Sequence, residues 1–157
     1  MASTTFSGPV TSTNGFIGAL TGNVTGNVTG NVAGSGSITH ATTAAINATA
    51  TATAAEVATG YITSTSVGTV TITLPTGTLL GAALSAAKGT IFDLYVDNTA
   101  GASVVTVAVA TNGILSSGAA DTPGSFGDLT IAAGATGLAR FTIMFSSATA
   151  YVFTRTA

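Results

Sequence analysis

The chain has 157 residues, of which only 5% are charged, and its three basic and five acidic side chains give a net charge of −2. So few cations cannot form the run of phosphate contacts that nucleic-acid binding requires, so nucleic acid is not expected as a partner. Cysteine is absent and no unbroken apolar run reaches about twenty residues, so disulfide bonds, thiolate metal sites and a membrane-spanning helix are not expected either.

Residues 1–58 form a low-complexity segment dominated by Thr, Ala, Gly, Asn and Ser. Within it, LTGNVTGNVTGNVAG (20–34) repeats a four-residue unit, and an even period keeps each residue type on one side of an extended strand. Val24, Val28 and Val32 therefore share a face with the glycines, while threonine and asparagine occupy the other face. Repeated glycine and β-branched valine oppose a helix, so we expect an extended arm.

An isolated extended arm leaves its backbone groups and valines without partners, and identical copies can supply them. We therefore predict a homotrimer in which three arms wind together, with Val24, Val28 and Val32 directed at the common axis. The alternative interpretation is a flexible, solvated linker, which is typical of Gly-rich polar segments. The regular valines disfavour that alternative, because a spacer does not need an apolar side chain at every fourth position.

The segment ATTAAINATATATAA, residues 41–55, fits two conformations. Its alternation of alanine and threonine is typical of an extended strand, but alanine also favours a helix. The conformation of residues 41–58 is therefore left open, as a neck between the arm and the rest of the chain.

From residue 59 the sequence alternates apolar and polar residues in short segments separated by Gly-containing turns, which indicates an antiparallel β-sandwich or jelly roll. The expected inward stripes are Val70, Ile72 and Leu74; Phe92, Leu94 and Val96; Val105, Val107 and Val109; and Phe141, Ile143 and Phe145.

Further elements are expected between these stripes. Shorter strands are predicted within 61–66 and 129–133, and a C-terminal hairpin is predicted to turn at 146–148. One short helix is predicted over 78–89, with Gly89 placed to end it. The predicted fold is all-β and is divided into an arm and neck (1–58) and a body (59–157) with at most one short helix.

The chain offers few groups for catalysis or metal binding. His40 is the only histidine, and we expect a polar contact in the trimer or simple exposure for it. Asp93 and Asp97 lie on one face of their predicted strand but about 13 Å apart, too far to act on one bond. Asp121 and Asp128 frame a Gly-rich loop without the spacing of a calcium-binding loop. We predict no catalytic, cofactor-binding or metal-binding residue, and an enzyme is not expected.

The segment FSGPVTSTNGFIGALTGNVTGNVTGNVAG, residues 6–34, resembles the N-terminal arms of small virion proteins of tailed bacteriophages. These are head decoration or cement proteins and short head or tail fibres, and the resemblance rests on the STNGFIG lead-in followed by TGNV units. KGTIFDLYVDNTAGASVVTVAV, residues 88–109, is similar in style to a strand, turn and strand of phage decoration domains. The resemblance supplies no catalytic residue.

The resemblance implies a homotrimer on the outer capsid surface of a virion, with arms that lace over the major capsid protein and a β-domain that projects outward. It also implies synthesis in the bacterial cytoplasm, which agrees with an N-terminus that lacks the pattern of a secretory signal. Five apolar residues spaced along the polar arm are predicted to be anchors on the capsid: Phe6, Val10, Phe16, Ile17 and Leu20. The leading hypothesis is therefore a capsid decoration protein that stabilises a phage head.

The alternative hypothesis is a fibre or adhesin module that recognises a host surface glycan. The ligand contacts would then come from the loop 112–128 or from Tyr61, Tyr95 and Tyr151, which are predicted to point outward. Sugar-binding sites combine an aromatic platform with several polar groups, whereas these tyrosines are dispersed in the sequence and tryptophan is absent.

Overall fold

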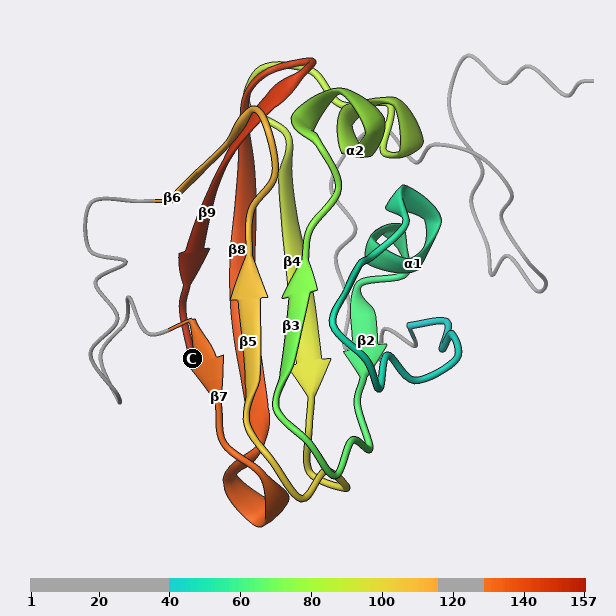
Figure 1. Ribbon diagram of the computed structural model, residues 1–157. Coiled ribbons are helices and arrows are strands. Elements are labelled where there is room, and N and C mark those ends of the chain that lie inside the picture. The colour runs from blue at the N-terminus through green and yellow to red at the C-terminus, as the bar shows by residue number, and fades with distance from the viewer. Residues whose placement is uncertain (1–39, 116–128) are drawn as a thin grey trace, which may run out of the picture. The chain divides into compact units, whose positions relative to one another are not determined.

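Two β-sheets share one hydrophobic core in the computed structural model, which describes residues 40–115 and 129–157 (Figure 1). The four-stranded sheet has the order β1-β3-β5-β7 and the five-stranded sheet the order β2-β4-β8-β9-β6. The strands are β1 (Ala50–Thr51), β2 (Tyr61–Thr63), β3 (Val70–Thr73), β4 (Ile91–Asp97), β5 (Val105–Ala108), β6 (Gly113–Leu115), β7 (Thr130–Ile131), β8 (Leu138–Ser147) and β9 (Ala150–Arg155). The helices are α1 (Ala54–Ala58), α2 (Gly77–Ala83) and a 3₁₀-helix at Gly134–Thr136. The described part of the chain is therefore mostly β, as the sequence predicts.

Consecutive strands from β1 to β8 belong alternately to the two sheets, and only β9 pairs with the strand before it. When the chain crosses to the opposite sheet and back, the returning strand runs in the same direction as the strand that it left. The pairs β1–β3, β3–β5 and β2–β4 are therefore parallel. The β6–β9 pair is also parallel, whereas β4–β8, β5–β7 and β8–β9 are antiparallel. The expectation of purely antiparallel sheets is wrong. Parallel neighbours need a long connection, and here a strand of the opposite sheet supplies it in place of the helix of a βαβ unit.

The core is built from the alternating segments of both sheets. The following members of the predicted stripes are buried: Val70, Ile72, Leu74, Leu94, Val96, Val105, Val107, Phe141, Ile143 and Phe145. Phe92 and Val109 are partly buried and pack against the same core. Phe141 stacks on Phe153 with 4.8 Å between the ring centres. Burying one such side chain stabilises a fold by about 1.5–3 kcal/mol, so the facing stripes hold the two sheets together.

Residues 40–58, which the sequence groups with the arm, lie in the same compact unit as the strands, Ser37–Ala157. This segment contains β1, which pairs with β3, and α1. A capping box starts α1: the Glu56 N–H donates to Thr53 Oγ1 at 3.2 Å, and the Thr53 N–H donates to Glu56 Oε2 at 2.7 Å. The helix α1 thus lies in the segment whose conformation the sequence leaves open, and α2 is the one α-helix among the described residues of 59–157, beside a 3₁₀-helix of three residues.

The helix α2 is shorter than the predicted segment 78–89. It starts after Thr76, whose hydroxyl accepts from the Leu79 N–H at 3.3 Å. It ends at Ala83, and the chain then turns away at Ser85, which has a positive φ of 49°. Gly89 therefore lies beyond the helix, in the loop that leads to β4.

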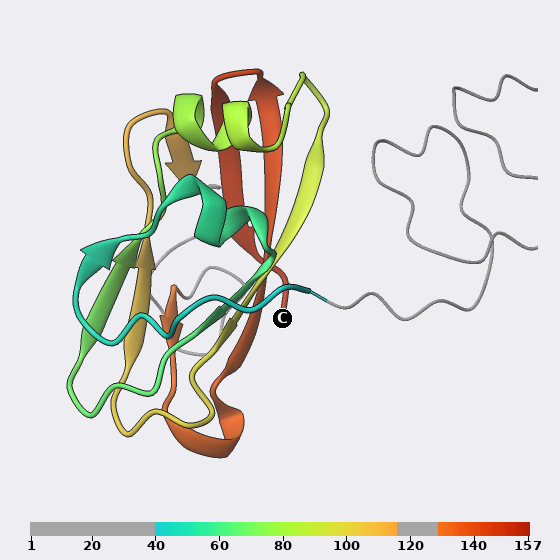
Figure 2. The same cartoon turned by 90° about the vertical axis from the view of Figure 1, so that its right-hand side faces the viewer.

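The two helices lie next to each other on the same side of the sheets (Figure 2). Each occupies a connection from the four-stranded to the five-stranded sheet, α1 after β1 and α2 after β3. Val57 of α1 and Leu80 of α2 are fully buried. The helices thus extend the core between the two sheets.

Two glycines one helical turn apart set how closely α2 approaches the turn between β8 and β9. A Cβ added at Gly77 would overlap the carbonyl oxygen of Thr149, and a Cβ at Gly81 would overlap that of Ala148. Since Cβ atoms are not found at such distances from backbone oxygens, only glycine fits at these positions. The helix is held directly against the hairpin backbone.

Replacing Gly81 with alanine is expected to lower the free energy of unfolding by about 1–3 kcal/mol, the range for overpacked sites. Helix propensity alone would make the alanine variant more stable by about 1 kcal/mol. A lower free energy of unfolding therefore reports the clash with the Ala148 carbonyl oxygen. Gly68→Ala is the matched control, because nothing lies within 4 Å of its Cβ position. Chemical denaturation measures both variants, and an unchanged or raised stability of Gly81→Ala would contradict the close approach.

Asn98 follows β4 and joins two connecting segments from a fully buried position. Its Nδ2 donates to the carbonyl oxygens of Ser103 and Ala132, at 2.9 Å each. Its backbone N–H donates to the Gly137 carbonyl at 2.6 Å, and its own carbonyl accepts from the Gly101 N–H at 3.0 Å. These partners belong to the turn after β4 and to the segment between β7 and β8. Asn98 therefore fixes the connections between the sheets at this end.

Replacing Asn98 with aspartate is expected to destabilise the protein by at least about 3 kcal/mol. The buried carboxylate would face two carbonyl oxygens and has no hydrogen to donate to them. Asn47→Asp makes the same chemical change at an exposed site and keeps the Oδ1 that accepts from the Thr65 N–H at 2.7 Å. It should change the stability by less than about 1 kcal/mol. Similar unfolding midpoints for the two variants would contradict a role of the Asn98 amide in holding these connections.

Candidate functional site

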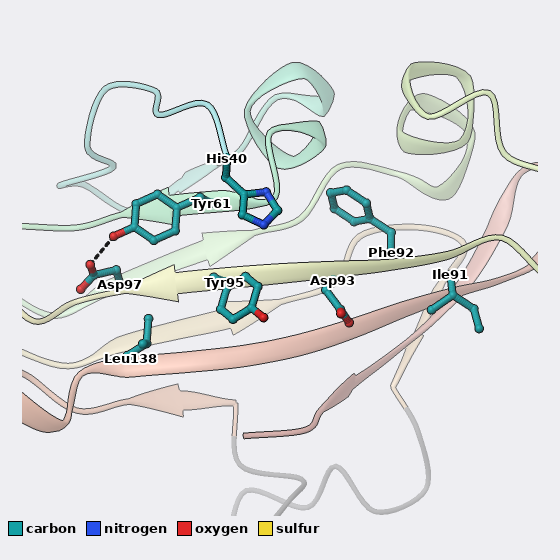
Figure 3. A pocket seen from close by; sticks show the side chains of 8 residues that line it. All are labelled: His40, Tyr61, Ile91, Phe92, Asp93, Tyr95, Asp97 and Leu138. Carbon is teal, nitrogen blue, oxygen red and sulfur yellow. Dashed lines mark hydrogen bonds between the residues drawn. The ribbon is translucent and has the colours of Figure 1, made fainter. Parts of the chain in front are cut away.

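The outer face of the five-stranded sheet carries a groove with a volume of about 550 Å³ (Figure 3). It runs along β4 and takes further residues from β2, from the start of β8 and from the segment before β1. The lining residues are His40, Tyr61, Ile91, Phe92, Asp93, Tyr95, Asp97 and Leu138. The groove thus combines aromatic, carboxylate and aliphatic side chains.

Two tyrosines lie side by side in the groove. Tyr61 on β2 and Tyr95 on β4 are register partners in a parallel pair, so their side chains leave the same face of the sheet (Figure 3). The Tyr95 ring has the His40 ring at 5.7 Å between centres, and the guanidinium carbon of Arg140 lies 6.0 Å from its centre. Both tyrosines are half-buried. They form an aromatic surface that the sequence, with its dispersed tyrosines, does not predict.

The Asp97 carboxylate is held at one end of this surface. Its Oδ2 accepts from the Tyr61 hydroxyl, and its Oδ1 accepts from the backbone N–H and the hydroxyl of Thr99 at 2.8 and 2.6 Å. Burial raises the pKa of Asp97, but the hydrogen bonds from Thr99 and Tyr61 outweigh burial, so the pKa lies below its ordinary value. The hydrogen bond to Asp97, followed by burial and the carboxylate charge, raises the pKa of Tyr61.

These shifts define the pH range in which the Tyr61–Asp97 pair supports the fold. The lowered pKa of Asp97 gives a contribution that is present above the ordinary carboxyl pKa of about 4 and is lost as the pH falls through the lowered value. The raised pKa of Tyr61 gives a contribution that is present below about 10 and is lost as the pH rises through the raised value. The pair is therefore intact at neutral pH.

Asp93 has partners of its own on β8. Its Oδ2 accepts from Nη2 of Arg140 at 2.6 Å, and its Oδ1 accepts from the Thr142 hydroxyl at 2.9 Å. The hydrogen bond from Arg140, opposed by burial and aided by Thr142, lowers the pKa of Asp93. The Arg140 and Asp93 side chains are 45% and 34% exposed, so solvent screens the ion pair and its effect on stability is small. Asp93 and Asp97 thus act in separate networks on one strand face.

His40 enters the groove from the segment before β1. Its Nδ1 lies 2.9 Å from the carbonyl oxygen of Thr59. A carbonyl can only accept, so Nδ1 carries the proton and, in the neutral ring, Nε2 is left as an acceptor. Gly60 makes room for the ring, since a Cβ at this residue, whose φ is +77°, would lie 2.5 Å from Nδ1. The histidine is therefore fixed in place as part of the groove, a location that the sequence does not predict.

The third tyrosine does not belong to this surface. Tyr151 is fully buried, its hydroxyl donates to the Pro75 carbonyl at 3.0 Å, and burial raises its pKa to about 12. The expectation that Tyr151 points outward is wrong, because it shares the inward face of β9 with Phe153. Asp121, Asp128 and most of the loop 112–128 lie outside the described residues.

The predicted arm sites also lie outside the described residues. They are the trimer-axis residues Val24, Val28 and Val32 and the capsid anchors Phe6, Val10, Phe16, Ile17 and Leu20. Their roles remain predictions.

Beside the groove, four aliphatic side chains form a row across the same sheet. Ile91 of β4 lies opposite Met144 of β8, Met144 lies opposite Val152 of β9, and Val152 lies opposite Ile114 of β6. Ile91, Met144 and Ile114 are 66%, 45% and 54% exposed. The row contains no charged side chain. A contiguous exposed apolar strip of this kind is typical of surfaces that contact another protein.

Among residues 40–115 and 129–157, no cluster of three or more histidine, cysteine or carboxylate side chains lies within reach of one metal ion. None of the helices in this part of the chain has the length and apolar character needed to span a bilayer.

Comparisons with models of protein families, with curated proteins and with solved structures gave no significant match for this chain.

Replacing Asp97 with asparagine is expected to lower the pKa of Tyr61 toward its ordinary value, because the charged acceptor of its hydroxyl is lost. Ultraviolet absorbance of tyrosinate during a base titration measures this shift. A Tyr95→Phe background simplifies the titration, since the remaining Tyr151 has a pKa of about 12. Asp93→Asn in the same background is the control, because Asp93 is not among the groups that act on Tyr61. Equal shifts in the two variants would contradict the specific pair.

Proposed function

We propose that this protein is a structural virion protein that binds the outer surface of a phage head as a homotrimer and stabilises the shell. The observation that carries the proposal is the TGNV-repeat arm, with a valine at every fourth position from Val24 to Val32, in front of a mostly β body of very low charge. The major capsid protein is the proposed partner.

In this proposal the arm makes two kinds of contact. The valines of the repeat meet those of two other copies at the trimer axis, while the apolar residues before the repeat enter grooves on the capsid. An arm of fifteen extended residues would span roughly 50 Å, at ~3.3 Å per residue, enough to reach a neighbouring capsid protein. The body is proposed to be a β-sandwich that projects outward from the particle.

The outer face of the five-stranded sheet supports a role in protein contacts. The apolar row from Ile91 to Ile114 is exposed, and the nearby Asp93 and Arg140 form an ion pair with each other. A surface with few free charges repels neighbouring copies weakly, which favours close arrangement on a shell. Contacts of modest energy suffice there, because binding to many identical sites stabilises the assembled state by mass action.

Removing residues 2–20 is expected to leave the body folded and to abolish attachment to the parent head, because all five predicted anchors are removed. Cosedimentation with purified heads measures attachment, and a circular dichroism melt checks the fold. Substituting Val67, which is exposed on the body, with threonine is the control and should preserve attachment. Binding of the truncated chain at the stoichiometry of the intact chain would refute the anchoring role of the arm.

Electron microscopy of the decorated head gives the direct test of location. Regular trimeric density on the outer capsid surface is the expected result, and static light scattering of the free protein should give the mass of three copies. A monomer in solution together with bare heads would end the proposal.

Recognition of a host surface glycan is the second candidate function. Tyr61 and Tyr95, which are far apart in sequence, form one aromatic surface in a groove that also contains carboxylates. A glycan array separates the candidates: specific sugar binding by the body favours an adhesin, and its absence with regular capsid density favours decoration alone.

A further inference from the structure

The groove on the five-stranded sheet has an apolar floor suited to a ring with an aliphatic face. Tyr61 and Tyr95 are adjacent, and Leu138, which is 52% exposed, flanks them at the start of β8 (Figure 3). Rigid tyrosine rings supply a large contact area at a low cost in side-chain entropy. The volume of about 550 Å³ lies within the range of small-molecule sites.

The polar groups around this floor are mostly acceptors. The Asp97 carboxylate has about four lone-pair positions and uses three of them for Thr99 and Tyr61. Asp93 uses one oxygen for Arg140 and the other for Thr142, which leaves further acceptor capacity. Nδ1 of His40 donates to Thr59, so Nε2 is the ring nitrogen that accepts whenever the ring is neutral. A ligand that satisfies these groups must be rich in hydrogen-bond donors.

These acceptors are held in place before any ligand arrives. Each carboxylate is fixed by two partners, and the histidine is fixed by a backbone carbonyl. Groups that are already ordered lose little further freedom on binding. The arrangement therefore favours a ligand with several hydroxyl groups at fixed positions on a compact ring.

The charge of the groove selects among such ligands. Asp93 and Asp97 carry two negative charges, and Arg140 supplies one positive charge that is already paired with Asp93. The remaining negative charge repels a carboxylated, sulfated or phosphorylated sugar. A neutral sugar meets no such penalty.

We infer that this groove binds a neutral pyranose sugar. The C–H face of the ring lies against Tyr61 and Tyr95, and its hydroxyl groups donate to Asp97, Asp93 and the Nε2 of His40. The inference rests on the second candidate function, glycan recognition, and defines the site and the sugar class for it. Capsid attachment through the arm does not depend on it.

Titration of the full chain with single sugars tests the inference, and NMR of the only histidine gives an unambiguous probe in the groove. The probes are the methyl glycosides of galactose, glucose and mannose, with N-acetylneuraminic acid as the acidic comparison. At least one neutral glycoside is expected to shift the imidazole signal of His40 with a Kd of about 1–10 mM, a modest binding free energy. The acidic sugar should bind at least about tenfold more weakly than that glycoside.

Variants locate the sugar. Tyr95→Ala should weaken binding at least about tenfold, a change of about 1.4 kcal/mol, whereas Tyr95→Phe keeps the ring and should retain most of the affinity. Val152→Ala alters the same sheet outside the groove and should leave the affinity unchanged. The amide spectrum of each variant checks its fold, and Asp97→Asn, which keeps the side-chain shape, should weaken binding severalfold if Tyr95→Ala does not fold.

Three outcomes would overturn the inference: no shift of His40 with any neutral glycoside at about 100 mM, tighter binding of the acidic sugar, or full binding by both Tyr95→Ala and Asp97→Asn. Each of them leaves the cosedimentation assay unaffected. Failure of sugar binding is thereby distinguished from failure of the decoration proposal.

Discussion

Hydrophobic contact between the two sheets is the interaction on which the rest of the structure depends. Up to β8 no strand pairs with the strand before it, so hydrogen-bonded neighbours are always separated by a strand of the opposite sheet. The stripes that include Ile72 and Leu94 must therefore meet across the core for the parallel pairs to form. Such non-local pairing makes folding slow compared with a helical bundle of similar size. The β8–β9 hairpin is the exception, and its turn supports α2.

The same arrangement creates the groove. Parallel pairing of β2 with β4 places Tyr61 beside Tyr95, and antiparallel pairing of β4 with β8 places Arg140 beside Tyr95 and Thr142 beside Asp93. His40 is added by the segment before β1, where Gly60 leaves space for it. The decoration proposal relies on the arm and on the apolar row, whereas the glycan proposal uses the groove, and Ile91 belongs to both the row and the groove lining.

Local patterns in the sequence predicted most of the strands but not their partners; they missed β6, which lies in a segment predicted as a loop, and left the segment of β1 open. Alternation of Val70, Ile72 and Leu74 with threonine shows which side is buried, whatever strand lies next to it. The T-x-x-E motif of Thr53 and Glu56 also signals α1 and could have been recognised. The proximity of Tyr61 and Tyr95 could not, because it depends on strands crossing between the sheets, and a sequence without helices between strands favours antiparallel pairing.

The aliphatic row on the five-stranded sheet has a consequence for the order of events in assembly. Its members come from four strands, and Ile114 joins the row only when β6 lies against β9. A chain with β6 unpaired lacks Ile114 at one end of the row and presents a shorter strip. Any contact that uses the whole row is therefore restricted to chains in which β6 has paired with β9.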